Sequence, residues 1–237
     1  MKIQEIYKVC VPESKKKTDK LIPWLYYVIR PLSILFTKPI LKTSISPVQV
    51  TFISMVATLI GFVMIGFGHD VSMRLYGWIG FFVWAVLDCV DGNVARCKGL
   101  ASERGALWDA TGGYMALSLI FFAVGIAAYN DTNIIDFMDK HLYIVLGGLT
   151  SLMSLFPRLV MQKKKAGKNG VDAVKAVGDK ASFSLPKIIV LNIESAIGFM
   201  QVVVAFAIIF HFLNIFISIY FLINILIMTY SLYTLLK

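Results

Sequence analysis

Residues 81–121 have the sequence FFVWAVLDCVDGNVARCKGLASERGALWDATGGYMALSLIF, in which two apolar runs flank a short polar stretch. The apolar runs continue outward to residues 72 and 128, and each is long enough to cross a bilayer as a helix of about 20 residues. The order apolar, polar, apolar therefore predicts two spanning helices joined at one membrane surface. Three aspartates, Asp88, Asp91 and Asp109, lie close to that surface.

The composition of the whole chain is that of a membrane protein. Its 237 residues are 58% hydrophobic and 16% charged, whereas soluble domains have about half apolar and about a quarter charged residues. This excludes a secreted disulfide scaffold and a disordered tail, and it disfavours a soluble nucleic-acid binder despite the net charge of +9. Cys10, Cys89 and Cys97 have no paired spacing, so we expect reduced, structural thiols.

Six apolar stretches are long enough to span, so the predicted fold is an all-α integral membrane protein with six transmembrane helices. Residues 21–45 are too interrupted by charges to span, and they predict an interfacial amphipathic helix. The predicted organisation is a basic cytoplasmic tail at 1–20, the interfacial helix at 21–45 and a six-helix domain at 46–237. The predicted spans lie near 49–68, 72–95, 106–128, 142–162, 188–211 and 213–235.

Basic residues set the predicted orientation. Of 23 Lys and Arg, 21 fall on one side of the predicted spans, and only Arg74 and Lys140 fall on the other. By the positive-inside rule, the first side is cytoplasmic, and it contains both termini and the polar stretch. No apolar run follows the basic start of the chain, so we expect no cleaved signal peptide. Anionic lipid headgroups and phosphorylated substrates are the expected partners of this surface, and nucleic acid is not.

The three aspartates would be costly against lipid, so we expect them to face protein or a ligand. Asp88 and Asp91 share a helix face, and Asp109 lies about one turn into the next helix. A hairpin would bring their carboxylates together, and such oxygen ligands favour Mg²⁺, Mn²⁺ or Ca²⁺. The alternative is that each aspartate pairs with Arg96 or Arg104.

The polar stretch resembles the signature of the CDP-alcohol phosphatidyltransferases, D-x2-D-G-x2-A-R-x8-G-x3-D-x3-D, in seven of its eight fixed positions. The resemblance implies transfer of a phosphatidyl or phospho-alcohol group from a CDP-linked donor to an acceptor hydroxyl, with release of CMP, in phospholipid biosynthesis. It also implies a Mg²⁺ or Mn²⁺ ion held by Asp88, Asp91 and Asp109. The residues implied to surround the nucleotide are Gly92, Ala95, Arg96 and Gly105.

The expected partners are a CDP-linked lipid or alcohol, an acceptor alcohol with or without a phosphate, membrane lipids, and a second copy of the chain in a homodimer. Arg158 and Lys163, which follow the fourth predicted span, are candidates for binding an acceptor phosphate. Members of the family that use phosphorylated acceptors are similar in this respect. The alternative is that these basic residues only fix the topology and attract lipid headgroups.

The signature has a fourth aspartate where this chain has Gly113, and the family assigns that residue to a second metal, to acceptor deprotonation, or to both. A one-metal enzyme that passes the proton to water, to Asp109 or to substrate phosphate is one interpretation. In a second, Glu194 replaces the acid, although an ion pair with a basic residue is its alternative role. The third is a natural or engineered inactive relative that binds CDP-lipid or nucleotide without turnover. A small transporter is less favoured, because the three aspartates lie at one membrane surface. A milder departure is Val48, where the family commonly has Asn.

Overall fold

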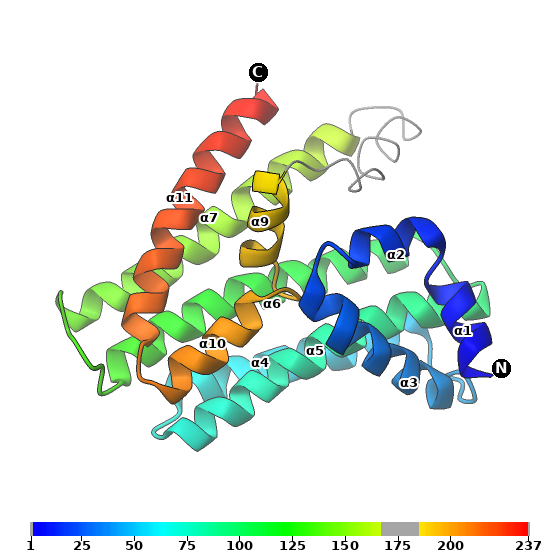
Figure 1. The fold of residues 1–237 in the computed structure, drawn as a ribbon, viewed down its shortest axis with the longest axis horizontal. Coiled ribbons are helices and arrows are strands. Elements are labelled where there is room, and N and C mark those ends of the chain that lie inside the picture. Colours follow the sequence, from blue (N-terminus) through cyan, green and yellow to red (C-terminus); the bar gives the residue numbers. More distant parts are fainter. Residues whose placement is uncertain (1, 167–184, 237) are drawn as a thin grey trace. The chain divides into compact units, whose positions relative to one another are not determined.

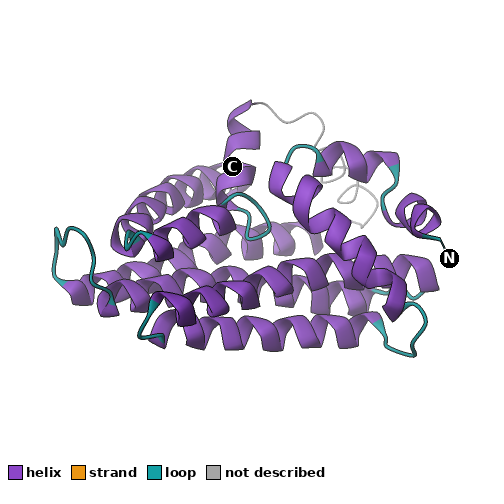
Figure 2. Ribbon diagram, turned by 60° about the horizontal axis from the view of Figure 1, so that its bottom comes forward, coloured by secondary structure: helices purple, strands orange, loops and turns teal. Residues whose placement is uncertain are grey.

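The computed structural model describes residues 2–166 and 185–236, and this part of the chain consists of helices and connecting turns, without a strand (Figure 1, Figure 2). The all-α prediction is therefore confirmed for the described residues. In chain order the helices are α1 (Ile3–Cys10), α2 (Glu13–Asp19), the π-helical turn η1 (Leu25–Ile29), α3 (Arg30–Ile40), α4 (Pro47–Phe67), α5 (Val71–Lys98), α6 (Glu103–Asn130), α7 (Lys140–Ala166), α9 (Leu185–Glu194), α10 (Met200–Ile209) and α11 (Leu213–Leu236).

Five of the described helices are long and apolar enough to cross a membrane. They correspond to five of the six predicted spans, and each begins within three residues of its predicted start. These candidate spans are Pro47–Phe67, Val71–Lys98, Glu103–Asn130, Lys140–Lys163 and Leu213–Tyr233.

The predicted span at 188–211 is not a single helix, so the six-span prediction is not confirmed. Helices α9 and α10 have 10 residues each, and neither is long enough to cross a bilayer. In the break between them, the backbone N–H of Phe199 donates to the carbonyl of Asn192 at 3.1 Å. A β-carbon at Gly198 would lie 2.7 Å from the same carbonyl oxygen, so only glycine fits this turn. Mean hydropathy averages over the whole apolar segment, so it does not reveal a turn that depends on individual residues.

The segment predicted as an interfacial helix contains η1 and α3, which follow one another directly. Helix α3 turns a polar side toward the protein and apolar side chains outward. Its attachment to a membrane surface stays a prediction, as does the domain division at residue 45. The buried polar side carries Arg30, Ser33 and Thr37, and the exposed side carries Leu35 and Phe36.

Capping interactions fix where the long helices begin. Ser46 and Gln49 form a reciprocal capping box before α4: the backbone N–H of Gln49 donates to Ser46 Oγ at 3.3 Å, and that of Ser46 donates to Gln49 Oε1 at 2.8 Å. Pro47 occupies the first helical position, where its missing N–H costs nothing. Before α5, Asp70 Oδ1 accepts a hydrogen bond from the backbone N–H of Met73 at 2.6 Å.

The chain forms two compact units, each assembled from segments that are distant in sequence. The first unit comprises residues 1–61, 78–116 and 184–203, and the second comprises 62–77, 117–183 and 204–237. The core of the first unit packs η1, α4 and α5 around apolar side chains that include Trp84 and Val90. In the second unit α7 packs along α11.

Glycines allow close helix contacts within each unit. In the first unit, a β-carbon at Gly80 of α5 would lie 2.8 Å from the carbonyl oxygen of Ala57 in α4. In the second, a β-carbon at Gly125 of α6 would lie 2.8 Å from the Cα of Gly147 in α7. Small residues at such crossings let helix backbones pack directly, which stabilises helix pairs in membranes.

Candidate functional site

The three signature aspartates lie in the first unit, on α5 and α6. Helix α5 ends at Lys98 and is followed by Gly99, whose φ of +66° is in the left-handed region that favours glycine. Helix α6 begins at Glu103, directly after Ser102, whose Oγ accepts a hydrogen bond from the backbone N–H of Gly105 at 3.1 Å. These two signals produce the turn that the sequence predicts between the two helices.

The turn brings the three carboxylates within electrostatic reach of one another. Asp88 interacts with both Asp91 and Asp109, and Asp91 also interacts with Asp109. Asp91 is buried, Asp88 is half-buried and Asp109 is exposed. The exposure of the carboxylates in this acidic cluster therefore increases from Asp91 through Asp88 to Asp109, which lies on α6.

Helix α4 supplies a hydroxyl group that orients one of these aspartates. The side chain of Thr51, which is only 3% exposed, donates a hydrogen bond to Asp91 Oδ2 at 2.5 Å. Sequence inspection missed Thr51, and the available signal was its polar side chain in the first turns of an apolar span. Its position shows that three helices build the acidic cluster.

The alternative, in which the aspartates pair with Arg96 or Arg104, is not observed among the described residues. Neither Asp88 nor Asp109 has a hydrogen-bond or ion-pair partner in that part of the chain. Within residues 2–166 and 185–236, no three His, Cys, Asp or Glu side chains stand close enough to hold a metal ion as they are placed. The donor chemistry of three carboxylates still suits a divalent cation, and ligation would require the side chains to move closer together.

Arg96 lies over the start of the signature. A β-carbon at Gly92 would lie 3.3 Å from the Nη2 atom of Arg96, so glycine leaves room for the guanidinium group. The same Nη2 donates to Asn93 Oδ1 at 3.0 Å. Gly105 belongs to the N-terminal cap of α6, and Ala95 is half-buried on α5.

Asn93 is a second residue that sequence inspection missed, because the signature leaves its position unspecified. It is fully buried, and its Nδ2 donates to Ser33 Oγ at 3.3 Å and to Thr37 Oγ1 at 3.1 Å, both on α3. Asn93 therefore connects Arg96 of the signature to the segment that precedes the spans. The signal available in the sequence was an amide side chain near the end of an apolar run.

Gly113 lies on α6 one turn beyond Asp109, in open space. A β-carbon built there meets no atom within 4 Å, so the surroundings can accommodate a side chain without a clash. Steric exclusion therefore does not explain the glycine. The preceding residue, Gly112, is more closely packed, because a β-carbon there would lie 3.5 Å from Cγ2 of Thr51.

The other predicted site residues are located elsewhere. Arg158 and Lys163 lie on α7 in the second unit, where Arg158 Nη1 donates to the carbonyl of Ser154 at 2.6 Å and Lys163 is exposed. Their role toward an acceptor phosphate stays a prediction. Glu194 is the last residue of α9 and is half-buried.

An open pocket of about 540 Å³ lies beside the signature in the first unit. Its lining is mainly apolar and contains no acidic residue, so it is not the acidic cluster itself. Trp108, the neighbour of Asp109, faces this pocket, and so does Val48, where the signature family commonly has Asn. The lining residues are Ser44, Ile45, Val48, Gln49, Phe52, Ile53 and Trp108.

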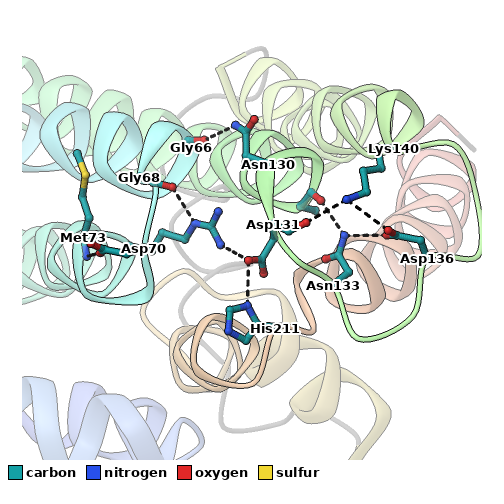
Figure 3. Close-up of polar contacts among 12 residues, drawn as sticks. Gly66, Gly68, Asp70, Met73, Asn130, Asp131, Asn133, Asp136, Lys140 and His211 are labelled. Carbon is teal, nitrogen blue, oxygen red and sulfur yellow. Dashed lines mark hydrogen bonds and ion pairs between the residues drawn. The ribbon is translucent and has the colours of Figure 1, made fainter.

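The second unit holds a different buried cluster, which Figure 3 shows. Arg74 Nη1 pairs with Asp131 Oδ1 at 2.6 Å, and His211 Nδ1 lies 2.9 Å from the same oxygen. Arg74 Nε also donates to the carbonyl of Gly68 at 3.1 Å, and Lys140 Nζ donates to the carbonyl of Asp131 at 3.2 Å. The cluster thus joins the turns that precede α5, α7 and α11.

A comparison with known families identifies the class of protein. The family model described as CDP-alcohol phosphatidyltransferase matches residues 44–230, which is most of the chain. The chain belongs to the CDP-alcohol phosphatidyltransferase family. No curated protein and no solved structure matches it.

Membership of the CDP-alcohol phosphatidyltransferase family gives the reaction class, which is transfer of a phosphatidyl group from a CDP-alcohol by a transferase of phospholipid biosynthesis. Together with the five long apolar helices, it identifies an integral membrane protein. The matched range begins at residue 44, so α1, α2, η1 and α3 lie outside it.

Proposed function

We propose that this chain transfers a phosphatidyl or phospho-alcohol group from a CDP-linked donor, such as CDP-diacylglycerol, to the hydroxyl group of an acceptor alcohol. The observation that supports the proposal most directly is the proximity of Asp88, Asp91 and Asp109, two of which have no hydrogen-bond or ion-pair partner among the described residues. Carboxylates without a hydrogen-bond or ion-pair partner are costly in a membrane protein, and such residues mark functional sites by default.

The three aspartates would hold Mg²⁺ or Mn²⁺, which prefer oxygen ligands. A bound ion would supply positive charge to the diphosphate of the donor and to the departing CMP. Thr51 fixes the rotamer of Asp91 through its hydrogen bond, and Asn93 holds the guanidinium group of Arg96. Gly92, Ala95, Arg96 and Gly105 are proposed to surround the nucleotide.

In the proposed reaction, the acceptor oxygen bonds to the β-phosphorus of the donor as the bond from that phosphorus to the CMP oxygen breaks. CMP leaves with the electron pair. The proton of the acceptor hydroxyl passes to Asp109, to water or to a substrate phosphate, because Gly113 has no group that can accept it. The distribution of basic residues supports a reaction site that faces the cytoplasm, with both termini on that side.

The test is CMP release from CDP-diacylglycerol by the full chain in liposomes, with glycerol phosphate, inositol phosphate or serine as the acceptor. A second assay uses a CDP-alcohol as the donor and diacylglycerol as the acceptor. We expect Mg²⁺- or Mn²⁺-dependent release that falls on the order of 10²–10³-fold in Asp88→Asn. Asp136→Asn, which removes a carboxylate on the other unit, is the control and should retain the rate. CMP release that survives Asp88→Asn would contradict the proposed site.

Gly113 favours a second candidate, a relative that binds CDP-lipid or nucleotide without turnover. The open space at Gly113 makes the two candidates separable, because Gly113→Asp adds a carboxylate without a clash. If a missing general base limits the rate, Gly113→Asp should raise CMP release by about 10²–10⁴-fold, while the uncharged Gly113→Asn should not. Absence of turnover in the wild type and in Gly113→Asp, with retained binding of CMP, would favour the binding protein.

A further inference from the structure

Two cations from the segment before the family match lie close to the acidic cluster. Lys15 of α2 interacts electrostatically with Asp88 and Asp109, and Arg30 of α3 interacts with Asp88. Arg96 of the signature interacts with Asp91 and Asp109. Lys15 also interacts with both arginines, so the three cations form one group within the first unit.

Both arginines retain buried donors without a partner. Arg30, which is 3% exposed, uses Nε and Nη2 in a pair with Asp19 at 2.8 and 3.2 Å, and its Nη1 has no hydrogen bond. Arg96 uses Nη2 with Asn93, and its Nε is buried without a hydrogen bond. Buried guanidinium donors are almost always satisfied in folded proteins, so two unsatisfied donors in one group indicate a missing acceptor.

A continuous chain of hydrogen bonds joins the backbone of Arg30 to the side chain of Arg96. Ser33 Oγ donates to the carbonyl of Arg30 at 2.8 Å, Asn93 Nδ2 donates to Ser33 Oγ, and Arg96 donates to Asn93 Oδ1. The guanidinium group of Arg96 is therefore positioned by Asn93, and that of Arg30 is positioned by its pair with Asp19. Positioned donors of this kind suit the oxygens of a phosphate group.

Lys15 adds a third donor to the group. It forms no ion pair among the residues that the structure describes. Lys15 is half-buried. An ammonium group in this environment is stabilised when an anion binds beside it.

We infer that Lys15, Arg30 and Arg96 form a binding site for a phosphate group beside the acidic cluster, and that the segment before the family match supplies most of it. The phosphate belongs either to the diphosphate of the CDP-linked donor or to a phosphorylated acceptor. The inference rests on the proposed function, because it takes the three aspartates as the reaction centre. It assigns substrate recognition to residues 15 and 30, which lie outside the matched range of 44–230.

The test is calorimetric titration of the full chain in phosphatidylcholine nanodiscs, in the presence of Mg²⁺. Cytidine 5′-diphosphate represents the donor, glycerol 3-phosphate represents the acceptor, and cytidine and glycerol are the matched probes without phosphate. We expect Lys15→Gln to weaken binding of the relevant phosphate probe about tenfold, as for the loss of one charge-assisted hydrogen bond. The probe whose affinity falls identifies the source of the phosphate.

Lys17→Gln is the matched control, because Lys17 lies on the same helix, is exposed and carries the same charge. It should bind both phosphate probes as the wild type does, and Lys15→Arg should restore the affinity lost in Lys15→Gln. Removing Arg30 alone would leave Asp19 buried and unpaired, so the second variant combines Asp19→Asn with Arg30→Gln. This variant should show the same selective loss.

Equal binding of both phosphate probes by the wild type, Lys15→Gln and the Asp19/Arg30 double variant would overturn the inference, and so would an equal loss in Lys17→Gln. No binding of either phosphate probe by the wild type would overturn it as well. Failure of the proposed function would give a different result. In that case CMP release is absent, while the phosphate probes still bind Lys17→Gln more tightly than Lys15→Gln.

The position of the segment before the match has its own check. Cys10 Sγ of α1 lies 3.2 Å from Cys97 Sγ at the end of α5, although both thiols are free. Hydrogen peroxide should join them in a disulfide, with two water molecules formed per peroxide and thiol pair. Burial and the neighbouring Cys97 raise the pKa of Cys10 to about 12, so we expect cross-linking to be slow at neutral pH and faster at higher pH. Mass spectrometry that finds Cys10 joined to Cys89, or to neither cysteine, would contradict the placement.

Discussion

The acidic cluster of the first unit and the charged cluster of the second unit differ in how their carboxylates are paired. In the second unit, Asp131 receives both Arg74 and His211, and Arg74 is also bound to a backbone carbonyl (Figure 3). In the first unit, Asp88 and Asp109 face other carboxylates and have no ion-pair partner among the described residues. A buried charge that loses its partner destabilises the fold, whereas carboxylates without an ion pair in a membrane protein mark a functional site.

The comparison also extends to the backbone. His211 has a φ of +56°, a left-handed conformation that non-glycine residues seldom adopt, in the turn between α10 and α11. The ring of His211 holds this turn against Asp131, whose Oδ1 lies 2.9 Å from Nδ1. In the first unit the one left-handed residue among those described is Gly99, which adopts it without strain. The paired cluster therefore includes a residue of a strained turn, whereas the turn next to the acidic cluster contains glycine at its left-handed position.

The largest expected difference between the two clusters is in stability. Asp131→Ala should lower the free energy of unfolding by about 3–5 kcal/mol, because it leaves Arg74 buried and uncompensated. Asp88→Ala should leave it unchanged or raise it, because it removes repulsion between like charges. Urea unfolding of both variants in the same detergent measures the difference. The double variant Arg74→Met with Asp131→Leu should recover most of the loss, and equal destabilisation by Asp131→Ala and Asp88→Ala would contradict the comparison.

A smaller effect is expected at Thr51, which contacts the acidic cluster without belonging to it. Thr51→Val keeps the shape of the side chain and removes the hydrogen bond to Asp91, a change of about 1 kcal/mol. We expect CMP release to fall by about fivefold, with kcat affected more than KM for the donor. Thr58→Val removes a buried hydroxyl that bonds only the carbonyl of Ser54 in the same helix, and it serves as the control. Equal losses in the two variants would indicate a general packing effect.

The smallest effect is expected at an exposed pair, where solvent weakens the interaction of charges. Asp139 caps α7 through the backbone N–H of His141, and this bond together with the His141 ring lowers the pKa of Asp139. The carboxylate therefore contributes stability above its unfolded pKa of about 3.9, and the contribution is lost as the pH falls through its lower folded pKa. Asp139→Asn should retain the cap and remove this small pH dependence. Thermal unfolding between pH 2 and pH 6 measures it, and an unchanged profile would contradict the assignment.

The sequence was a good guide wherever one strong pattern controlled the outcome. Long apolar runs predicted five helices, because hydrocarbon leaves the backbone few alternatives. The polar stretch between two apolar runs predicted a turn between two helices, and a glycine and a serine cap make the turn between α5 and α6 short. Such local rules require no knowledge of distant residues.

Prediction failed where a specific turn or a contact between distant residues decides the structure. The break after Glu194 depends on a turn closed by the carbonyl of Asn192, and mean hydropathy averages over both. Asn93 and Thr51 were missed because their partners come from α3 and from α5, and single-chain periodicity does not reveal those pairings. The predicted division between a tail and an interfacial helix also gave no indication that Lys15 and Arg30 lie beside the aspartates.

The break between α9 and α10 has a consequence for the order in which the protein is made. Asn192 Nδ2 donates to the carbonyl of Leu21 at 2.7 Å, and Trp24 Nε1 donates to Gln201 Oε1 at 3.2 Å, across 171 and 177 residues of sequence. The ribosome completes most of the chain before either bond can form. We expect the first unit to complete its packing only late in synthesis. A chain released before residue 192 would lack the contacts that α9 and α10 make with Leu21 and Trp24.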